Sequence, residues 1–470
     1  MKIARITIAV YALTMFACSG IDGQEKAKTL AEQYGATAEE LAFLDSLQHR
    51  SFRYFVDEMN PENGLVKDRT KATSPSSTAA TGFGVVAWGI GAERGWISRE
   101  QARENTLALL RFLKNSEQST DSLATGHQGF YYHFLHMKTG QRYWGCELST
   151  IDTALLFAGL RFAMSYYNRD DAPEQEIRTT VAELTERINW NWTTLPEDAG
   201  RAAGTVTMGW RPERGFLSHG WTGYNEALYL YVFAAGCGYD DAQQAYQNWL
   251  KFYRWEEPYP GLAHVTFPPL FGHQYSHMFV DFRGLGDAYM REKGIDYFEN
   301  SRRAAYTQRQ YAVDNPMGWV GYDSLTWGLT ACDGPGQSYN TDDRKFYTYT
   351  ARGTSGPNRI QRDDGTIAPT AAAGSIVFAP EIVIPTLQKM LERYGEKGLW
   401  GPHGFYDAFN PTVDWIDPDY IGIDQGPIVI MIENFRTGMV WEYSMRDPLI
   451  QRGLDVLDFR EVKSQKTNSK

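Results

Sequence analysis

Cysteine is scarce in this sequence, and the four cysteines present do not form a recognisable framework. Cys18 lies in the N-terminal segment, and Cys146, Cys237 and Cys332 are widely separated. None of them has the close pairing that zinc sites use, and the odd number left after Cys18 argues against a disulfide-stapled fold. We interpret these three as buried free thiols, although one bridge remains open if the chain is exported.

Positive charge is also in short supply. The chain has 46 lysine and arginine residues against 57 aspartate and glutamate residues, which gives a net charge of −11 and a pI near 5.4. No basic stripe offsets this excess, so the composition argues against nucleic acid and anionic membrane surfaces as partners. We expect a monomer that acts on a neutral substrate.

Several common catalytic motifs are absent. The sequence has no G-x-S-x-G elbow, P-loop or dinucleotide fingerprint, which excludes serine or cysteine hydrolase chemistry and nucleotide chemistry. The pairs His133/His136 and His273/His277 could each share one face, but no H-E-x-x-H occurs and no carboxylate stands at ligand spacing. We therefore predict no metal and no cofactor, and we assign these histidines to hydrogen bonds with sugar hydroxyls, with structural histidines as the alternative.

Long apolar runs are missing except at the start of the chain. Residues 1–20 have a short basic beginning and an apolar stretch too short to span a membrane stably. This pattern predicts an export signal, and Ala17-Cys18-Ser19-Gly20 resembles a bacterial lipoprotein cleavage site. We expect a periplasmic or outer-membrane lipoprotein that is lipidated at Cys18 and touches the membrane only through this anchor. The alternative is plain cleavage and a soluble exported protein.

The rest of the chain has the composition of one large globular domain. It is 43% hydrophobic and 22% charged, and no proline-, serine- or glycine-rich linker divides it. We expect a flexible tether over residues 19–36, a single domain over 37–460 and a disordered tail over 461–470.

Helical periodicity dominates that domain. Capping boxes at Thr37–Glu40 and Ser98–Gln101 mark two helix starts. Apolar spacing predicts further helices over residues 78–94, 149–168, 174–189, 225–235, 240–253, 275–290, 297–313, 380–394, 424–441 and 447–457. Strand signals are limited to residues 205–210 and 366–378. The predicted fold is all-α, and six antiparallel hairpins closed into an (α/α)6 toroid would fit, with an open α-solenoid as the alternative.

Four carboxylates stand where a long loop becomes a helix: Glu147, Asp152, Glu226 and Asp424. Hydrolysis of a glycosidic bond needs two such groups, one protonated and one ionised. Each also has a structural interpretation, because Asp424 at the predicted N-cap, Asp152 beside Ser149 and Glu226 after Asn225 could simply stabilise helix starts. The loops before these helices are rich in aromatic residues and glycine, as expected for a cleft that binds sugars.

Several long motifs occur in the order typical of one family. Together they resemble the bacterial glucoamylase-like proteins of glycoside hydrolase family 144, over roughly residues 41–457: W-T-G-Y-N-E-A, H-Q-Y-S-H-M-F-V-D-F-R, W-G-L-T-A-C-D-G-P, D-G-T-I-A-P-T-A-A-A-G-S and I-G-I-D-Q-G-P. The resemblance implies a six-hairpin toroid and inverting, metal-independent hydrolysis of β-1,2-glucan. Most members are endo-acting, and some release sophorose from chain ends. It also implies that the acidic residues are Glu226 and Asp424, with Glu147 and Asp152.

Within this interpretation we expect Glu226 to be the general acid and Asp424 the general base. Partial desolvation should raise the pKa of Glu226, whereas the helix N-terminus should keep Asp424 ionised. Glu147 and Asp152 would orient sugar hydroxyls or relay protons. The predicted substrate-binding residues are His127, Tyr143, Trp144, Trp210, His219, Trp221, Tyr224, His273, His277, Arg283, Trp327 and Asp333.

Other functions use similar features. An exo-acting sophorose-releasing or β-glucosidase-type relative would share the same acids, and a non-catalytic surface glycan-binding lipoprotein would use the same aromatic loops. A polysaccharide lyase would need a cationic cleft with a tyrosine or histidine base. The motif loops contain more carboxylates and aromatic rings than cations, so we disfavour the lyase.

Overall fold

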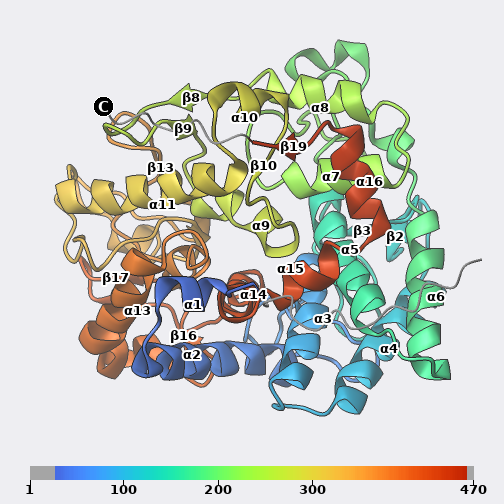
Figure 1. Cartoon of the computed structure of the whole chain (residues 1–470), viewed down its shortest axis with the longest axis horizontal. Helices are drawn as coiled ribbons and strands as arrows, with labels where there is room; N and C mark the ends of the chain where they lie inside the picture. The colour runs from blue at the N-terminus through green and yellow to red at the C-terminus, as the bar shows by residue number, and fades with distance from the viewer. Residues whose placement is uncertain (1–26, 463–470) are drawn as a thin grey trace, which may run out of the picture.

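The structure is a computed structural model that describes residues 27–462, so the predicted signal and lipidation site lie outside the described residues. This part of the chain is mainly helical, as predicted (Figure 1). The longer helices are α2 (Ala38–Asp57), α3 (Thr78–Glu93), α4 (Arg99–Asn115), α5 (Thr150–Tyr166), α6 (Ala172–Glu186), α7 (Leu228–Gly236), α8 (Ala242–Leu250), α11 (Tyr297–Asp314), α13 (Pro380–Tyr394), α14 (Gly422–Arg436) and α16 (Pro448–Val456). Five short ones are α1 (Leu30–Tyr34), α9 (Tyr275–Phe279), α10 (Ala288–Lys293), α12 (Pro369–Ala373) and α15 (Met439–Ser444).

The strands are only two or three residues long and lie in the loops. The largest sheet is antiparallel, in the order β2-β3-β5-β6-β7, and the others have two strands each. This sheet contains β2 (Gly126–His127), β3 (Phe130–Tyr132), β5 (Leu148–Ser149), β6 (Gly209–Arg211) and β7 (Gly215–Phe216). The two-stranded pairs are β1 (Ser76–Ser77) with β4 (Phe134–Leu135), β8 (Trp255–Glu256) with β9 (His264–Val265), β10 (Leu285–Gly286) with β19 (Arg460–Glu461), β11 (Ala331–Cys332) with β12 (Thr350–Ala351), β13 (Gly353–Thr354) with β14 (Ile360–Gln361), β15 (Trp400–Gly401) with β16 (Gly404–Phe405), and β17 (Phe409–Asn410) with β18 (Trp415–Ile416).

Four sequence-based boundaries need correction. The helix predicted over residues 275–290 is broken into α9 and α10, because Gly284 has a φ of 72° and Asp287 caps a new helix. The strand predicted over residues 366–378 is instead the short helix α12, which begins at Pro369. The helix predicted over residues 424–441 ends at Arg436, and α15 follows. Part of the expected tether forms α1, which has its own capping box.

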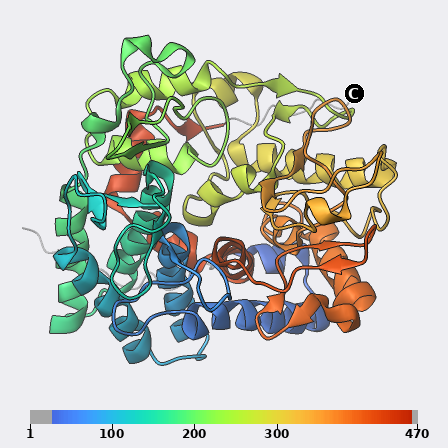
Figure 2. The same ribbon diagram turned by 180° about the vertical axis from the view of Figure 1, so that it is seen from behind.

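A set of helices that are buried on every side forms the centre of the fold. In α3, all residues from Thr78 to Gly91 are buried, and α5, α7 and α14 are nearly as enclosed. Such all-round burial is typical of helices inside a large core. α14 is seen end-on near the middle of the molecule from both sides (Figures 1 and 2). It contacts α2, α3, α9 and α12, while α3 packs on α5 and α5 on α7.

Glycine allows the closest of these contacts. A Cβ on Gly159 of α5 would lie 2.0 Å from the carbonyl oxygen of Gly82 in α3, and a Cβ on Gly82 would lie 2.5 Å from that of Leu155. Both distances are too short for any side chain. The two helices can therefore cross with their backbones in contact.

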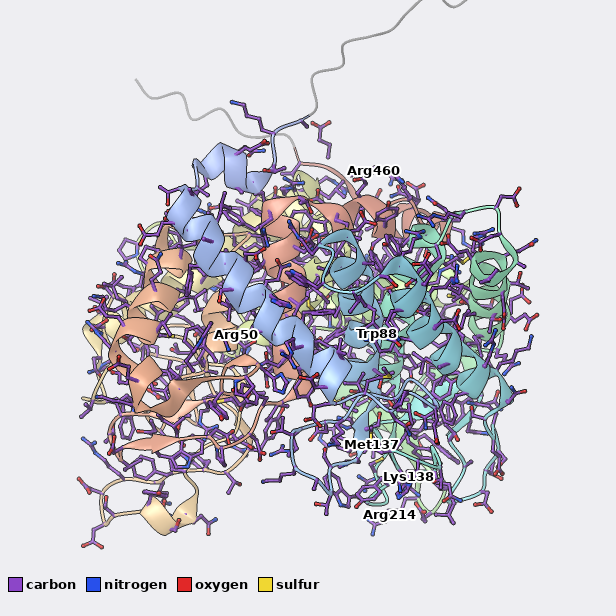
Figure 3. All side chains as sticks on the ribbon, turned by 90° about the horizontal axis from the view of Figure 1, so that it is seen from below. Arg50, Trp88, Met137, Lys138, Arg214 and Arg460 are labelled. Atoms are coloured by element: carbon purple, nitrogen blue, oxygen red, sulfur yellow. The ribbon has the colours of Figure 1, made fainter. Side chains whose placement is uncertain are left out.

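Long loops gather at one end of the molecule. In Figure 3, Met137, Lys138 and Arg214 lie at the end opposite Arg460. These residues belong to the loops that precede α5 and α7. Among residues 27–462, no helix combines the length and the apolar character needed to cross a membrane.

Candidate active site

Three side chains lie together at the N-terminal end of α5. His133 is central, since its Nδ1 is 2.9 Å from Glu147 Oε1 and its Nε2 is 3.6 Å from Asp152 Oδ1. Asp152 belongs to the first turn of α5, where its N–H donates to the Ser149 hydroxyl at 3.2 Å. The Ser149 hydroxyl in turn donates to the Asp152 carboxylate. The cap anticipated for Asp152 is therefore present, and His133 provides a second contact.

Electrostatics favour a protonated histidine within this trio. Burial alone would lower the pKa of His133, but Asp152 and Glu147 raise it to about 9. Burial raises the pKa of Glu147, but hydrogen bonds and charges from His133 and Arg211 outweigh this effect and hold the pKa of Glu147 at about 2. The Arg211 guanidinium lies 3.4 Å from the Glu147 carboxylate. Burial also raises the pKa of Asp152, against the opposing charge of His133. An imidazolium therefore lies between the two acids at neutral pH.

Glu226 lies just before α7, whose first residue is Leu228. Its side chain is partly exposed, but Oε2 is sealed from solvent and has no hydrogen-bond partner among residues 27–462. Burial raises the pKa of Glu226 to about 7, and the negative charge of Asp152 adds to the rise. This agrees with the raised pKa expected from the sequence. A carboxyl group of this kind keeps its proton close to neutral pH, as a general acid must.

Asp424 lies in the first turn of α14 and not at its N-cap, which is Ile421. The side chain is only 3% exposed, and Oδ2 is buried. Burial raises the pKa of Asp424 to about 7, a hydrogen bond with Asp407 opposes the rise, and the charge of Asp333 adds to it. The expectation that the helix N-terminus keeps this group ionised is therefore wrong, because desolvation outweighs a helix-dipole effect of about 1 kcal/mol.

Tyr275 connects the segments of Glu226 and Asp424. It is the first residue of α9, it is buried, and its hydroxyl donates to the Ile423 carbonyl at 3.4 Å. Burial raises its pKa, and the charges of Asp424 and Glu226 raise it further. The next residue, Ser276, donates from its hydroxyl to the Glu226 backbone carbonyl at 3.0 Å, so the start of α9 contacts the segments of both acids. The ends of α7, α9 and α14 converge at this point.

Arg69 forms ion pairs with two further acidic residues, Asp68 and Asp333. Its guanidinium is 3.1 Å from the Asp68 carboxylate and 2.6 Å from that of Asp333. The charge of Asp68 in turn influences the pKa of both His133 and Asp424. The acids near α5 and α14 thus belong to one connected network. Asp333, predicted to bind substrate, is part of it.

Exposed aromatic side chains border this network. Trp144 is 66% exposed, and its ring lies 5.0 Å from that of Tyr143 and 5.3 Å from that of Phe134. Phe134 stacks on His133 at 4.0 Å. A groove of about 930 Å³ lies beside Tyr143 and is lined by residues 57–62, Lys67, residues 72–75, residues 136–138 and Tyr143. Tyr143 therefore lies at the edge of this groove, with the exposed Trp144 next to it in the chain.

Two other predicted binding residues stack on one another near the start of α5. The ring centroids of His127 and Trp210 are 5.1 Å apart. Trp210 is paired with Leu148 in the five-stranded sheet, next to Glu147. His219 is exposed, and its backbone carbonyl accepts a hydrogen bond from Met208. These positions are at the loop end of the molecule.

Six other predicted binding residues have side chains that contact other parts of the protein. Five of them are buried in the core: Trp221, Tyr224, His273, His277 and Trp327. Their polar atoms are used internally, since Trp327 donates to Thr386, and the rings of His277 and His273 contact Ser301 and the Phe267 carbonyl. Arg283 follows the C-terminal end of α9, pairs with Asp281 and covers the Trp441 ring. The indole N–H of Trp221 donates to the Thr150 hydroxyl at 3.0 Å, at the start of α5. A role of these six residues in substrate binding stays a prediction.

Arg69 and Tyr275 were not among the predicted site residues, and His133, which was expected to bind sugar hydroxyls, instead lies between Glu147 and Asp152. Each reaches the site through partners more than ten residues away, for example Arg69 to Asp333 and His133 to Glu147. Periodicity and capping patterns report only local relationships. A charged K-D-R segment after a helix was the single local signal at Arg69.

Comparison with known proteins assigns the family. The model of the family described as "Putative glucoamylase" matches residues 218–448. A crystal structure of a protein with the same description, from Bacteroides uniformis, is 33% identical and has a TM-score of 0.79, over 90% of this chain and 98% of that one. The chain belongs to the glucoamylase-like family. This confirms the resemblance drawn from the sequence motifs.

Two other relatives have more specific descriptions. An endo-β-1,2-glucanase from Chitinophaga pinensis, solved with sophorotriose and glucose, is 27% identical with a TM-score of 0.75, over 90% of this chain and 99% of that one. An exo-β-1,2-glucooligosaccharide sophorohydrolase from Parabacteroides distasonis is 28% identical over 96% of this chain. The present chain spans only 61% of the length of this sophorohydrolase.

Proposed function

We propose that this glucoamylase-like protein hydrolyses β-1,2-glucan with inversion, with Glu226 as general acid and Asp424 as general base. One observation carries the proposal: the carboxyl groups of Glu226 and Asp424 are enclosed at the starts of two inner helices that both contact α9. Glu226 Oε2 has no hydrogen-bond partner in the described chain, and Asp424 is hydrogen-bonded to another acid, Asp407. Hydrolysis of a glycosidic bond requires two carboxyl groups, one that donates a proton and one that accepts one. The descriptions of the relatives support β-1,2-glucan as the substrate.

The chemistry assigns one proton transfer to each acid. Glu226, whose raised pKa lets it hold a proton, donates that proton to the glycosidic oxygen as the bond to the anomeric carbon breaks. Asp424 takes a proton from water, and the water oxygen forms the new bond on the opposite face of the sugar. Inversion needs roughly 6.5–9.5 Å between the two carboxyl groups, to leave room for this water.

The trio at α5 has a supporting role in this proposal. The protonated His133 holds Glu147 and Asp152 in fixed positions, and the Asp152 charge favours the protonated form of Glu226. Glu147 and Asp152 are then available to orient sugar hydroxyls. Trp144 and Tyr143 would stack on sugar faces at the rim.

The architecture we propose is a closed (α/α)6 toroid with one catalytic domain over residues 37–460. Contacts link α3 to α5, α5 to α7 and α7 to α9, while α14 contacts both α12 and α3. Gln274, just before α9, donates to the Ala371 carbonyl of α12 at 2.8 Å. Six inner helices would thus form a ring whose N-terminal ends meet at the acidic network.

We also propose that the protein is an exported lipoprotein of the periplasm or outer membrane, anchored through Cys18. The support is the basic and apolar start of the sequence and the Ala17-Cys18-Ser19-Gly20 segment. A bacterial enzyme anchored in this way would meet extracellular or periplasmic glucan.

A linkage panel tests the proposed function. Purified protein is incubated with β-1,2-, β-1,3-, β-1,4- and α-1,4-glucans, and new reducing ends are counted. Release from β-1,2-glucan alone is expected, and Glu226→Gln should abolish it. Mixed oligosaccharide sizes would identify endo action, whereas sophorose alone would identify exo action. Equal or greater release from α-1,4-glucan would contradict the proposal.

A further inference from the structure

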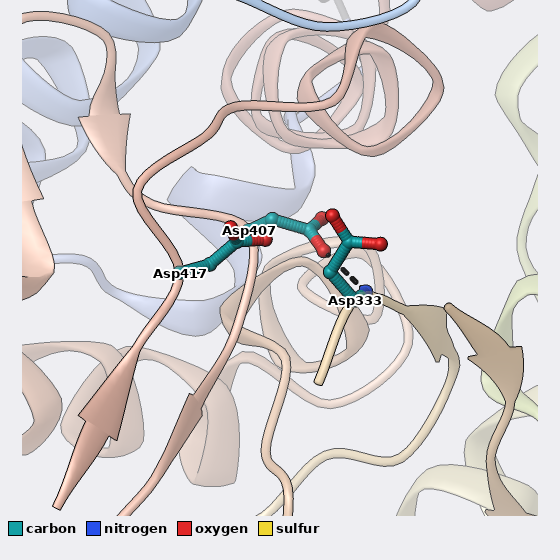
Figure 4. Close-up of side chains that lie close together, drawn as sticks. All are labelled: Asp333, Asp407 and Asp417. Atoms are coloured by element: carbon teal, nitrogen blue, oxygen red, sulfur yellow. Dashed lines mark hydrogen bonds between the residues drawn. The ribbon is translucent and has the colours of Figure 1, made fainter. Parts of the chain in front are cut away.

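Asp333, which pairs with Arg69, lies close to Asp407 and Asp417, and each of the three offers one carboxylate oxygen to a common region (Figure 4). These oxygens all lie within 4.8 Å of one another. Two oxygens that bind one calcium ion at about 2.4 Å are at most about 4.8 Å apart. The spacing therefore fits three ligands of one calcium-sized ion.

The two most buried members each have one anchored and one free oxygen. Asp407 and Asp417 are 2% and 3% exposed. Asp407 Oδ2 accepts the Asp333 N–H at 2.8 Å, and Asp417 Oδ1 accepts the Asp419 N–H at 3.1 Å. The other oxygens, Asp407 Oδ1 and Asp417 Oδ2, are buried and have no hydrogen-bond partner within residues 27–462. Buried carboxylate oxygens ordinarily have a partner, so these two indicate a ligand.

The charges around these carboxylates also favour a bound cation. Asp333 is neutralised by Arg69, and Asp419 is paired with Lys71 at 3.0 Å. In the described chain, no lysine, arginine or histidine forms an ion pair with Asp407 or Asp417. Asp424 also contacts Asp407 and adds to the negative charge. Buried carboxylates without a counter-charge are unfavourable unless a cation or protons compensate them.

We propose that Asp333, Asp407 and Asp417 bind one calcium ion. An all-oxygen, carboxylate-rich ligand set selects hard cations, and calcium ordinarily completes its coordination with carbonyl oxygens and water. The ion joins Asp333, after β11, to the segment around β17 and β18 that contains Asp407 and Asp417. It fixes Asp333, and through the ion pair of 2.6 Å also Arg69, beside the acidic network. This site would revise the sequence-based expectation of a metal-free protein.

Calcium titration of the chelator-treated full chain tests this site. Calorimetry should give one site per chain with a dissociation constant of about 10⁻⁷ to 10⁻³ M, and the melting temperature should rise on adding calcium. Asp417→Asn should weaken binding by a factor of about 10 or more. Asp333→Asn, at the exposed edge, provides a second variant if Asp417→Asn does not fold. Asp342→Asn, an exposed acid in a nearby loop, should bind like the wild type.

The contradicting results are equally specific. No calcium-dependent change in heat or melting temperature would overturn the site and would favour a proton shared between Asp407 and Asp424. Unchanged affinity in both Asp417→Asn and Asp333→Asn would overturn the location of the site, and tighter binding of magnesium would overturn calcium as the ion.

Hydrolysis of β-1,2-glucan is measured in parallel. Hydrolysis without calcium binding would refute only this inference, and calcium binding without hydrolysis would refute only the proposed function.

Discussion

Replacing Glu226 by glutamine should change how the stability of the protein depends on pH. Burial raises the pKa of Glu226 from 4.5 to about 7. A difference of this size corresponds to about 3 kcal/mol of unfavourable ionisation in the folded protein. Because the side chain is partly exposed, this figure is an upper limit. Glutamine fills the same space and has no proton to lose.

Whether stability rises or falls with pH depends on whether the folded or the unfolded chain loses the Glu226 proton at the lower pH. Below pH 4.5, Glu226 is protonated in both the folded and the unfolded chain, so its ionisation has no effect. Between pH 4.5 and 7 the unfolded chain releases the proton and the folded chain keeps it. The wild type therefore loses stability as the pH rises through this window, and Glu226→Gln does not.

Differential scanning fluorimetry at pH 5 and pH 8 measures the effect. For 470 residues the unfolding entropy is about 1 kcal/mol/K, so up to about 3 kcal/mol corresponds to a shift of up to about 3 °C. The melting temperature of Glu226→Gln, relative to the wild type, should be higher at pH 8 than at pH 5 by this amount. Glu396→Gln, an exposed control, should show no such difference. A pH-independent offset for Glu226→Gln would refute the buried, proton-holding Glu226.

Three further predictions concern activity, packing and location. Asp424→Asn should lower kcat by a factor of about 100 or more without lowering the melting temperature at neutral pH, because burial also raises the pKa of Asp424; turnover near the wild-type rate would remove Asp424 from the mechanism. In the wild type the buried Arg161 lies 2.5 Å from the Asp447 carboxylate. Asp447→Ala leaves this arginine without its partner and should lower the free energy of unfolding by about 3–5 kcal/mol in denaturant titrations. The exposed ion pair between Arg291 and Asp458 is the control. Asp458→Ala should change the free energy of unfolding by less than about 1 kcal/mol. Cys18→Ala should move the protein from the membrane fraction to the soluble fraction, and an unlipidated wild-type N-terminus would contradict the anchor.

Local signals in the sequence predict the helices well. Both hydrogen bonds of the capping box between Thr37 and Glu40 are present at the start of α2. The helix predicted over residues 380–394 has the same bounds as α13. Capping and periodicity depend on residues within one or two turns, and they are therefore readable from the chain itself.

The site depends on contacts that local patterns do not contain. His133 lies 14 residues before Glu147, and Arg69 is separated from Asp333 by 264 positions. The pKa of Asp424 was misjudged for the same reason, because its burial results from packing among distant helices. Likewise, the aromatic motifs around Trp221 and His277 read as surface loops and lie in the core.

The proposed inverting mechanism is tested most directly by following the anomer released first from β-1,2-glucan in a proton NMR time course. Glu226 as acid and Asp424 as base on water predict that the α-anomer appears first and that the β-anomer accumulates only through mutarotation. The same experiment with Glu226→Gln should release neither anomer. An initial β-anomer from the wild type would contradict the account, because retention requires a covalent intermediate in place of water activated by Asp424.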